Sequence, residues 1–301
     1  MSNSGQNRVS DKTPPLVTVA MPVYNAGSNL RLAVLSIVKQ TFTDWELLIV
    51  DDGSTDNAFQ TIADLNDARI RILRDGKNKG LAARLNECID LARGRYFARM
   101  DQDDVSYPER FAQQTVALEK DSALDLVTVR TITIDENNEV TGIFPGAIAH
   151  EEICARPWRG FHFPHPTWMG KMEWFRKYRY TEPGPYFCED QELLLRSYNK
   201  SRFATIDEIL FAYRVRGKTN WPKLAKTRRA VLKVQMSYFS KLNQWHYAVL
   251  ATATYLAKTG RDLSRRLCAE NNECKRIGAD DIVVFMWNTI LGGIAQEQNT
   301  P

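Results

Sequence analysis

Short apolar runs alternate with helix-length segments over residues 16–100, and this alternation constrains the fold more than any other feature of the chain. The apolar runs predict buried strands at residues 16–21, 46–50, 69–73 and 95–100. The segments between them carry apolar residues at helical spacing, at residues 30–38, 55–65 and 80–93. This order is typical of an α/β fold with a mostly parallel central sheet flanked by helices.

The second part of the chain is less regular. A helix, a strand, a short helix and a last strand are expected at residues 108–120, 126–134, 189–197 and 203–215. Residues 154–190 are rich in aromatic residues, glycine and proline, and we interpret them as the wall of a binding site. From Pro222 onward the pattern predicts a C-terminal helical extension.

Polar or acidic residues follow three of the predicted strands. Asn25 follows the first strand, Asp51 and Asp52 follow the second, and Asp101, Asp103 and Asp104 follow the fourth. Because the carboxyl ends of parallel strands meet at one edge of a sheet, we expect these side chains to share one site. Two carboxylates on a rigid strand end, completed by water and phosphate oxygens, suit Mg²⁺ or Mn²⁺. The sequence therefore predicts a polar, metal-dependent site at this edge.

The composition is that of an ordinary globular protein, with 44% hydrophobic and 25% charged residues among 301. The net charge of +4 is too small to predict a nucleic-acid partner. The charge is uneven, because residues 216–276 hold 14 Lys and Arg against three acids. We therefore expect an acidic catalytic body and a basic C-terminal region. That region would contact an anionic membrane peripherally, contact another copy of the chain in a homo-oligomer, or only form a solvated basic face.

We expect a cytoplasmic protein, placed peripherally at the inner face of the membrane if the basic region binds lipid. Residues 1–14 are polar, without the apolar segment of a signal peptide, and are expected to form a disordered lead. No window reaches the length of a membrane span, and five scattered cysteines predict neither a disulfide framework nor a zinc site. A dehydrogenase and an NTPase are disfavoured because G-x-G-x-x-G and Walker A sequences are absent.

Two stretches of the sequence resemble the family 2 glycosyltransferases. They read MPVYNAGSNLRLAVLSIVKQTFTDWELLIVDDGSTD and NKGLAARLNECIDLARGRYFARMDQDD, and they contain the P-x-Y-N, Q-T-F, D-D-G-S-x-D and D-x-D motifs in the order of that family. Later, CEDQEL resembles the E-D motif of the family, and YRVR resembles its closing Y-R-x-H segment, with Arg216 in the histidine position. The resemblance covers about residues 15–216.

The resemblance implies a GT-A fold and an inverting transfer of a sugar from a nucleotide-diphospho-sugar, most simply a UDP-sugar, to a hydroxyl of a glycan or lipid-linked glycan. It implies Mn²⁺ or Mg²⁺ on the diphosphate. Residues 15–110 would bind the donor and residues 111–216 the acceptor, and residues 217–301 would form the basic helical region. Two alternatives stay open. A sugar-nucleotide nucleotidyltransferase would need a basic, Gly-rich loop after the first strand, and a catalytically inactive carbohydrate-binding protein would keep the same fold.

The resemblance also implies roles for individual residues. Asp190 would be the general base, and Glu189 would orient it or contact the acceptor. Asp103 would be the main metal ligand, and Asp101 would face the metal or the ribose. The acceptor wall would include His165 and Trp168. The residues expected against the donor nucleotide are Pro22, Val23, Tyr24, Asn25, Asp51, Asp52, Asp101 and Arg84, with Asp52 or Asp51 on the base.

The residues by themselves leave other interpretations of these positions open. Arg84 stands one place before the arginine of many relatives, which is a rotation of about 100° on a helix. The turn after the first strand fits Pro22 and Asn25 without a ligand, and acidic residues at a helix start fit Glu189 and Asp190. The cations that would close over phosphate near the end of the domain are Arg214, Arg216 and Lys218.

Overall fold

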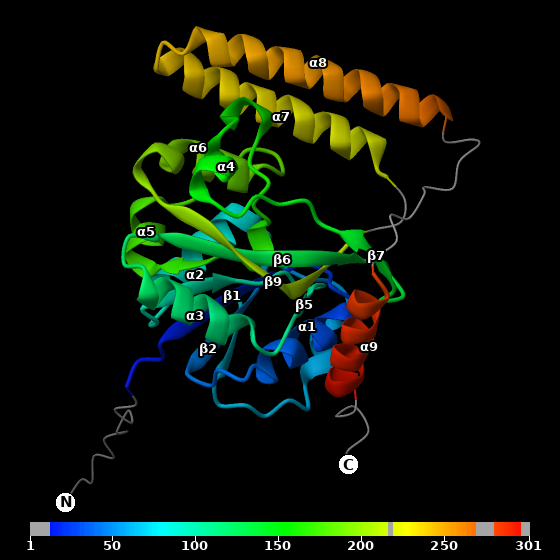
Figure 1. Ribbon diagram of the computed structural model, residues 1–301. Helices are drawn as coiled ribbons and strands as arrows, with labels where there is room; N and C mark the ends of the chain where they lie inside the picture. Colours follow the sequence, from blue (N-terminus) through cyan, green and yellow to red (C-terminus); the bar gives the residue numbers. More distant parts are fainter. Residues whose placement is uncertain (1–12, 216–218, 269–279, 296–301) are drawn as a thin grey trace, which may run out of the picture.

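The computed structural model describes residues 13–215, 219–268 and 280–295 (Figure 1). Most of the expected lead, together with Arg216 and Lys218, lies outside the described residues. The strands are β1 (Val17–Val23), β2 (Trp45–Asp51), β3 (Ile70–Arg74), β4 (Tyr96–Arg99), β5 (Val105–Ser106), β6 (Leu126–Ile134), β7 (Val140–Ile143), β8 (Met169–Lys171) and β9 (Phe203–Arg214). Within these residues they form one sheet in the order β3-β2-β1-β4-β8-β6-β9-β5, with β7 paired to β6.

Helices cover both faces of this sheet. The α-helices are α1 (Asn29–Val38), α2 (Leu81–Leu91), α3 (Arg110–Lys120), α4 (His150–Cys154), α5 (Met172–Lys177), α6 (Glu189–Ser197), α7 (Trp221–Lys241), α8 (Trp245–Cys268) and α9 (Asp281–Ala295). The short 3₁₀ segments are η1 (Ala58–Ile62), η2 (Pro157–Arg159), η3 (His165–Thr167) and η4 (Tyr198–Lys200).

The alternation of side chains along the buried strands explains the two hydrophobic layers. In β1, Val19 and Met21 join the cluster that holds Val34 of α1, whereas Ala20 joins the cluster that holds Leu85 of α2. Strands β2 and β4 flank β1, and β3 flanks β2, all in parallel. Their carboxyl ends therefore lie at one edge of the sheet, as the sequence predicts.

Beyond β4 the sheet is mixed. Strand β8 pairs antiparallel with both β4 and β6, β6 and β9 run parallel, and β5 pairs antiparallel with β9. The predicted α/β fold is confirmed, with the parallel pairing concentrated in the first half. The helix expected at residues 55–65 is only the 3₁₀ turn η1, because Asp56 accepts the Gly27 and Ala58 N–H groups and holds the chain in a turn before it.

The C-terminal helices separate onto different sides of the molecule. Helices α7 and α8 lie together above α4 and α6, at the top of the view in Figure 1, whereas α9 lies beside α1. Trp287 of α9 is fully buried, stacks on Tyr107 with ring centroids 6.1 Å apart, and donates its Nε1–H to the Asn138 carbonyl at 2.6 Å. None of the described helices combines the length and hydropathy needed to cross a bilayer.

Candidate active site

The turn after β1 brings an exposed aromatic ring to the carboxyl edge. Pro22 and Val23 are buried within β1, so their side chains do not face solvent. Tyr24 is 49% exposed, and its backbone N–H and carbonyl both bond to the Gln102 side chain, at 2.6 and 3.0 Å. Gln102 is the middle residue of the D-x-D motif. The P-x-Y-N turn and the D-x-D turn are therefore joined directly.

Asn25 fixes the other side of this turn. Its φ of 52° lies in the left-handed region, which asparagine adopts more readily than most residues. Its Oδ1 accepts the Thr55 N–H at 2.8 Å, and its own N–H donates to Ser54 Oγ at 3.1 Å. The structure thus explains Asn25 as a bridge between the first two strand ends.

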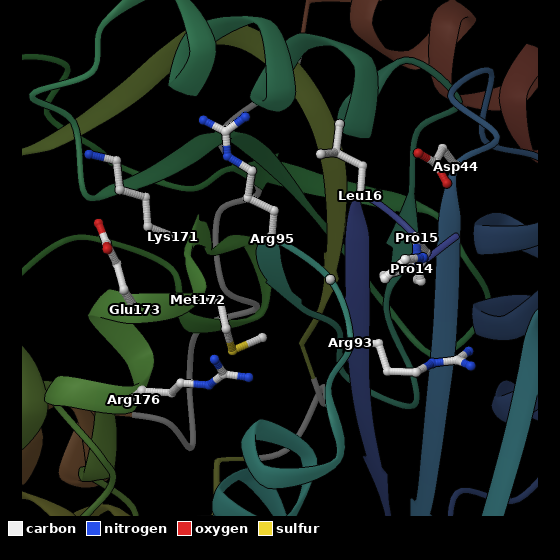
Figure 2. A pocket seen from close by; sticks show the side chains of 11 residues that line it. Pro14, Pro15, Leu16, Asp44, Arg93, Arg95, Lys171, Met172, Glu173 and Arg176 are labelled. Atoms are coloured by element: carbon white, nitrogen blue, oxygen red, sulfur yellow. The ribbon is translucent and has the colours of Figure 1, made fainter. Parts of the chain in front are cut away.

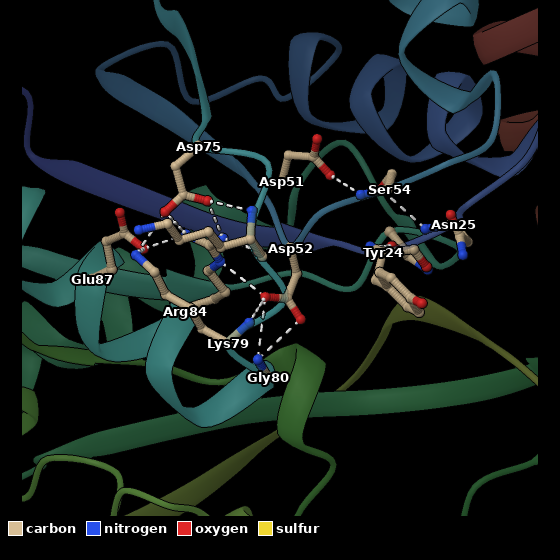
Figure 3. Close-up of polar contacts among 12 residues, drawn as sticks. Tyr24, Asn25, Asp51, Asp52, Ser54, Asp75, Lys79, Gly80, Arg84 and Glu87 are labelled. Atoms are coloured by element: carbon tan, nitrogen blue, oxygen red, sulfur yellow. Dashed lines mark hydrogen bonds and ion pairs between the residues drawn. The ribbon is translucent and has the colours of Figure 1, made fainter.

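Asp51 and Asp52, at the end of β2, have most of their charge balanced (Figure 3). Asp52 accepts the Lys79 and Gly80 N–H groups, at 2.6 and 3.1 Å, and the Arg84 Nε–H at 3.0 Å. Asp51 accepts the Ser54 N–H at 2.8 Å and Arg74 Nε–H at 2.9 Å. Burial opposes ionisation of Asp51, but these hydrogen bonds outweigh it and lower its pKa.

Arg84 occupies the centre of that network. Its side chain is buried, and its guanidinium pairs with Asp52, Asp75 and Glu87 at 3.0, 2.6 and 2.7 Å. Burial opposes its charge, but the three carboxylates raise its pKa. Because these partners occupy its donors, the geometry favours Arg84 as a support for Asp52 over the expected direct contact with a diphosphate.

In the turn after β4, Asp104 has less compensation than the two carboxylates at the end of β2. Asp104 is buried, and its Oδ1 accepts the Arg214 N–H at 2.8 Å. Among the described residues, no hydrogen-bond donor reaches its Oδ2. Burial, followed by the charges of Asp101 and Asp103, raises the pKa of Asp104 well above its ordinary value. Burial and the repulsion from its two neighbours therefore favour the protonated form of Asp104.

These residues fit a divalent cation. The donors are carboxylate oxygens, which Mg²⁺ and Mn²⁺ prefer, and the repulsion among three neighbouring carboxylates is what a cation relieves. No group of three or more His, Cys, Asp or Glu side chains within the described ranges is arranged to hold a metal by itself. A site of one or two carboxylates that is completed by water and substrate phosphates agrees with that finding.

A buried arginine connects this turn to the predicted acceptor wall. Arg99, fully buried in β4, pairs with Asp101 at 2.5 Å, and its Nε–H donates to His165 Nε2 at 3.2 Å. The Tyr180 hydroxyl lies 2.7 Å from the same ring nitrogen. Burial, followed by the charge of Arg99, lowers the pKa of His165 well below its ordinary value, so the ring is neutral. His165 also lies 3.8 Å from Glu189.

Helix α6 begins with the E-D pair, at the end where acidic residues are favoured by the helix dipole. Burial raises the pKa of both Glu189 and Asp190, and the neighbouring charge of Asp190 raises that of Glu189 further. Gln191 donates its Nε2–H to Asp190 Oδ2 at 3.0 Å and is itself held by both backbone polar groups of Phe161. The pair is thus oriented and holds protons more strongly than ordinary carboxyls.

The E-D and D-x-D motifs lie close enough to act on the same groups. Burial raises the pKa of Tyr213, and the charges of Asp104, Asp101, Asp103 and Asp190 raise it further. Sequence reasoning missed the residues that join the motifs, which are Arg99, Tyr180, Gln191 and Tyr213. A charged residue inside the buried strand YFAR was the available signal for Arg99.

The structure does not fit Trp168 as an acceptor contact. The side chain is 0% exposed, its Nε1–H donates to the Phe163 carbonyl at 3.1 Å, and its ring meets His165 edge-on with centroids 4.5 Å apart. Most aromatic side chains of residues 154–190 are likewise buried in the core, whereas Tyr186 and Phe187 are 42% and 53% exposed. Trp168 supports His165 from behind.

A cavity of about 620 Å³ lies at the opposite edge, where the strands begin (Figure 2). It is lined by Leu16 before β1, by Arg95 before β4, and by the basic side chains of Lys171 and Arg176. None of the residues predicted for the site lines it. Because ligands of open α/β sheets gather at the carboxyl edge, we place the active site there and not in this cavity.

Known proteins resemble the chain in sequence and in fold. An uncharacterized glycosyltransferase of Methanocaldococcus jannaschii, MJ1057, is 28% identical over 243 residues, which cover 79% of this chain and 82% of the relative. TarS of S. aureus, in complex with UDP-GlcNAc, matches with a TM-score of 0.58 and 18% identity over 73% of this chain and 66% of that chain. Mannosyltransferase PcManGT of Pyrobaculum calidifontis, in complex with GDP-Man and Mn²⁺, matches with a TM-score of 0.56 and 15% identity over 93% and 85%.

The two structural matches support the GT-A fold alone, because their sequence identities are low. Family membership rests on the sequence. The model of "Glycosyl transferase family 2" matches residues 18–179, which is more than half of the chain and includes the P-x-Y-N, D-D-G-S-x-D and D-x-D motifs. The chain therefore belongs to glycosyl transferase family 2 and is a glycosyltransferase.

Proposed function

We propose that this enzyme is a divalent-metal-dependent, inverting glycosyltransferase that moves a sugar from a nucleoside diphosphate sugar, most simply a UDP-sugar, to a hydroxyl of a glycan or glycolipid. The observation that carries the proposal is the gathering of two carboxylate motifs around the buried guanidinium of Arg99. Asp101 pairs with Arg99, and the charges of both Arg99 and Asp101 act on Glu189. The proposed metal ligands are therefore close to the motif of the proposed general base.

The donor base would lie against the turn after β1. Tyr24 offers an exposed ring for stacking, and Asp52 offers an acceptor for a base N–H. In the described residues, Asp52 Oδ2 accepts only the Gly80 N–H, at 3.1 Å, so a lone pair is available to the ligand. Uracil carries such an N–H donor, which supports a UDP-sugar. The TarS complex with UDP-GlcNAc supports the same class of donor.

Asp103 and Asp101 would hold Mn²⁺ or Mg²⁺ on the diphosphate. When bound, the cation supplies positive charge that stabilises the departing nucleoside diphosphate. Arg99 keeps Asp101 in place from behind, and Arg214 donates its Nε–H to the Asp103 carbonyl at 2.7 Å. The PcManGT complex, which contains GDP-Man and Mn²⁺, supports this arrangement.

Asp190 would act as the general base. It takes the proton of the acceptor hydroxyl while that oxygen forms a bond to the anomeric carbon, and the bond from this carbon to the diphosphate oxygen breaks with its electron pair. Attack from the face opposite the leaving group inverts the anomeric configuration. Gln191 orients Asp190, and Glu189 would contact the acceptor or position the base. The His165 ring lies 3.8 Å from Glu189.

We also propose that α8 touches an anionic membrane peripherally. Trp245, Val249, Leu256 and Leu263 are exposed and fall on one face of the helix, which is otherwise basic toward its end. The test is sedimentation of the full chain with phosphatidylglycerol vesicles at low salt. Loss of sedimentation in Leu256→Ser/Leu263→Ser supports the proposal, whereas a wild-type protein that stays in the supernatant rejects it. A change in oligomeric state instead would assign the face to a second copy.

A panel of nucleotide sugars, followed by thermal shift with Mn²⁺ and with EDTA, tests the proposed donor class. We expect at least one UDP-sugar to raise the melting temperature with Mn²⁺, because a ligand that binds the native state stabilises it. The gain should disappear in EDTA and in Asp103→Asn. If no nucleoside diphosphate sugar stabilises the wild type, or if the gain is equal in EDTA, the metal-dependent assignment fails.

A further inference from the structure

Four basic side chains line a cavity between η2 and α8, and we call them the η2–α8 cluster. They are Arg156 and Arg159, which flank and end η2, and Lys258 and Arg261, which lie about one turn apart on α8. All four line a cavity of about 480 Å³. Arg156 and Arg159 also line a second cavity, of about 470 Å³, that reaches His162.

The 3₁₀ segment η2 is fixed on the helical hairpin. The Trp158 ring stacks on Tyr247 of α8, with centroids 5.0 Å apart and an interplanar angle of 20°. Gln235 of α7 donates its Nε2–H to the Pro157 carbonyl at 3.0 Å. The backbone that presents the two arginines is therefore positioned before a ligand binds, which reduces the entropic cost of binding.

Among the described residues, the acidic side chains near the cluster, Glu152 and Asp262, form no ion pair with its four cations. Within residues that the structure describes, none of the four cations forms an ion pair, whereas neighbouring Arg228 pairs with Asp262. Lys258 Nζ donates only to the Arg159 carbonyl, at 2.9 Å. Burial, followed by the charges of Arg228, Arg159 and Arg261, lowers the pKa of Lys258 against the smaller opposing effect of Asp262. An anion placed among these groups would relieve their repulsion.

A series of cavities extends from the cluster toward the segment that carries His165. Gly146 and His162 line both the second cavity and a third one, of about 450 Å³, that extends to Pro164. Pro164 directly precedes His165, whose ring lies 3.8 Å from Glu189. The three cavities thus share lining residues in sequence, and the third one ends at the segment that carries His165.

Phosphate is the anion that this chemistry fits best. Guanidinium groups bind phosphate oxygens through paired N–H donors, and a lysine adds a compact charge. We propose that the η2–α8 cluster binds a phosphate or diphosphate group of the acceptor, while the acceptor hydroxyl reaches Asp190. The proposal rests on the proposed transfer reaction and narrows its acceptor to phosphate-bearing glycans and glycolipids. The donor diphosphate is a different ligand, because it belongs with Asp101 and Asp103.

Binding of inorganic pyrophosphate to the full chain tests the proposal. Isothermal titration is done in EDTA, so that no metal draws the probe to the D-x-D carboxylates. Arg159→Gln/Arg261→Gln is compared with Arg229→Gln/Lys233→Gln, a control that removes the same charge from exposed positions on α7 outside these cavities. We expect the cluster variant to lose about tenfold or more in affinity and the control less than about twofold. Circular dichroism verifies that both variants fold.

Two results would overturn the proposal. One is the absence of saturable binding by the wild type, and the other is equal weakening in both double variants, which would reduce the effect to overall charge. Phosphatidylglycerol vesicles separate a membrane surface from an acceptor group. If the cluster variant loses vesicle sedimentation while pyrophosphate does not bind, the cluster is a membrane contact. Because the titration uses neither donor nor transfer, its failure leaves the proposed transfer reaction intact.

Discussion

Two acidic clusters stand at the same edge of the sheet and differ in how their charge is balanced. In the Asp51–Asp52 corner, each carboxylate accepts backbone N–H groups and pairs with an arginine. In the catalytic cluster, formed by Asp101, Asp103, Asp104, Glu189 and Asp190, burial raises the pKa of three of the five carboxyls. The carboxylates of the Asp51–Asp52 corner are held in place by protein groups alone. In the other cluster, three buried carboxyls hold a proton more strongly than usual, and a cation would relieve the repulsion among its members.

Replacing the proposed base should have the largest effect. Asp190→Asn removes the group that accepts the hydroxyl proton, and we expect transfer to fall by about 10³-fold or more. The affinity for the donor should stay within about twofold, because donor binding uses the other motifs. Initial rates with the donor found in the panel, together with donor titrations, measure both quantities.

Glu192→Gln is the matched control for this variant. Glu192 lies in the same turn of α6 but pairs with Arg196 at 2.5 Å, and its position is rotated about 200° around the helix from Asp190. Transfer close to the wild-type rate in Glu192→Gln shows that the loss belongs to Asp190 and not to the start of the helix. An Asp190→Asn enzyme that keeps near-normal transfer would remove Asp190 as the base.

Replacing Arg84 removes the positive charge that balances Asp52 in the Asp51–Asp52 corner. Arg84→Gln leaves Asp52 buried without its guanidinium, and we expect the free energy of unfolding to fall by about 3 kcal/mol. Urea denaturation measures the loss. Donor affinity of the folded variant should change much less than stability. A stable variant with abolished donor binding would instead support the direct diphosphate contact expected from the sequence.

The catalytic cluster should make transfer sensitive to acid. Asp190 must be ionised to act, so transfer falls as pH drops through its raised pKa, above the range of an ordinary carboxyl near about 4. Stability should change in the opposite direction. Carboxyls with raised pKa values stabilise the fold when protonated, and this contribution is lost as pH rises through them.

Gln191→Met sharpens the pH comparison. The hydrogen bond from Gln191 lowers the pKa of Asp190, so its removal should shift the acid limb of the transfer profile to higher pH. The charged and titratable groups that act on the pair include Arg99, Asp101, His165, Tyr180, Cys188 and Tyr213, and the pKa of His165 lies well below its ordinary value. Profiles that coincide for Gln191→Met and the wild type would mean that another group sets the limb.

The smallest effect is expected at the rim of the balanced corner. The Arg74 side chain is 54% exposed, so Arg74→Gln should lower the free energy of unfolding by less than about 1 kcal/mol. Urea denaturation beside Arg84→Gln measures the difference. Equal losses in the two variants would show that burial of the guanidinium is not what distinguishes the corner.

The sequence predicted correctly where the residues at the ends of the parallel strands lie. Buried strands with abrupt polar ends predicted that Asn25, Asp52 and Asp101 would share one edge, because parallel strands leave no other arrangement for their carboxyl ends. The motif Glu189-Asp190 was placed correctly at a helix start for the same local reason. Their catalytic roles stay predictions until the variants are measured.

The sequence pattern could not predict contacts between residues far apart in the chain. Nothing local indicates that Tyr180 would meet His165, or that Arg99 would lie between His165 and Asp101. The burial of Trp168 was equally hidden, since an aromatic residue suits both a core and a sugar-binding wall. The sequence pattern also did not show that α9 packs apart from α7 and α8. Its position beside α1 depends on the contact of Trp287 with Tyr107.

Binding of Mn²⁺ in the presence of UDP, followed by electron paramagnetic resonance, tests the difference between the two clusters most directly. Asp103→Asn removes a carboxylate from the catalytic cluster, and Asp75→Asn removes one from the network of Arg84. We expect the wild type and Asp75→Asn to bind Mn²⁺ with similar affinity and Asp103→Asn to bind at least about tenfold more weakly. Undiminished Mn²⁺ binding by Asp103→Asn would contradict the assignment of the metal to the D-x-D turn.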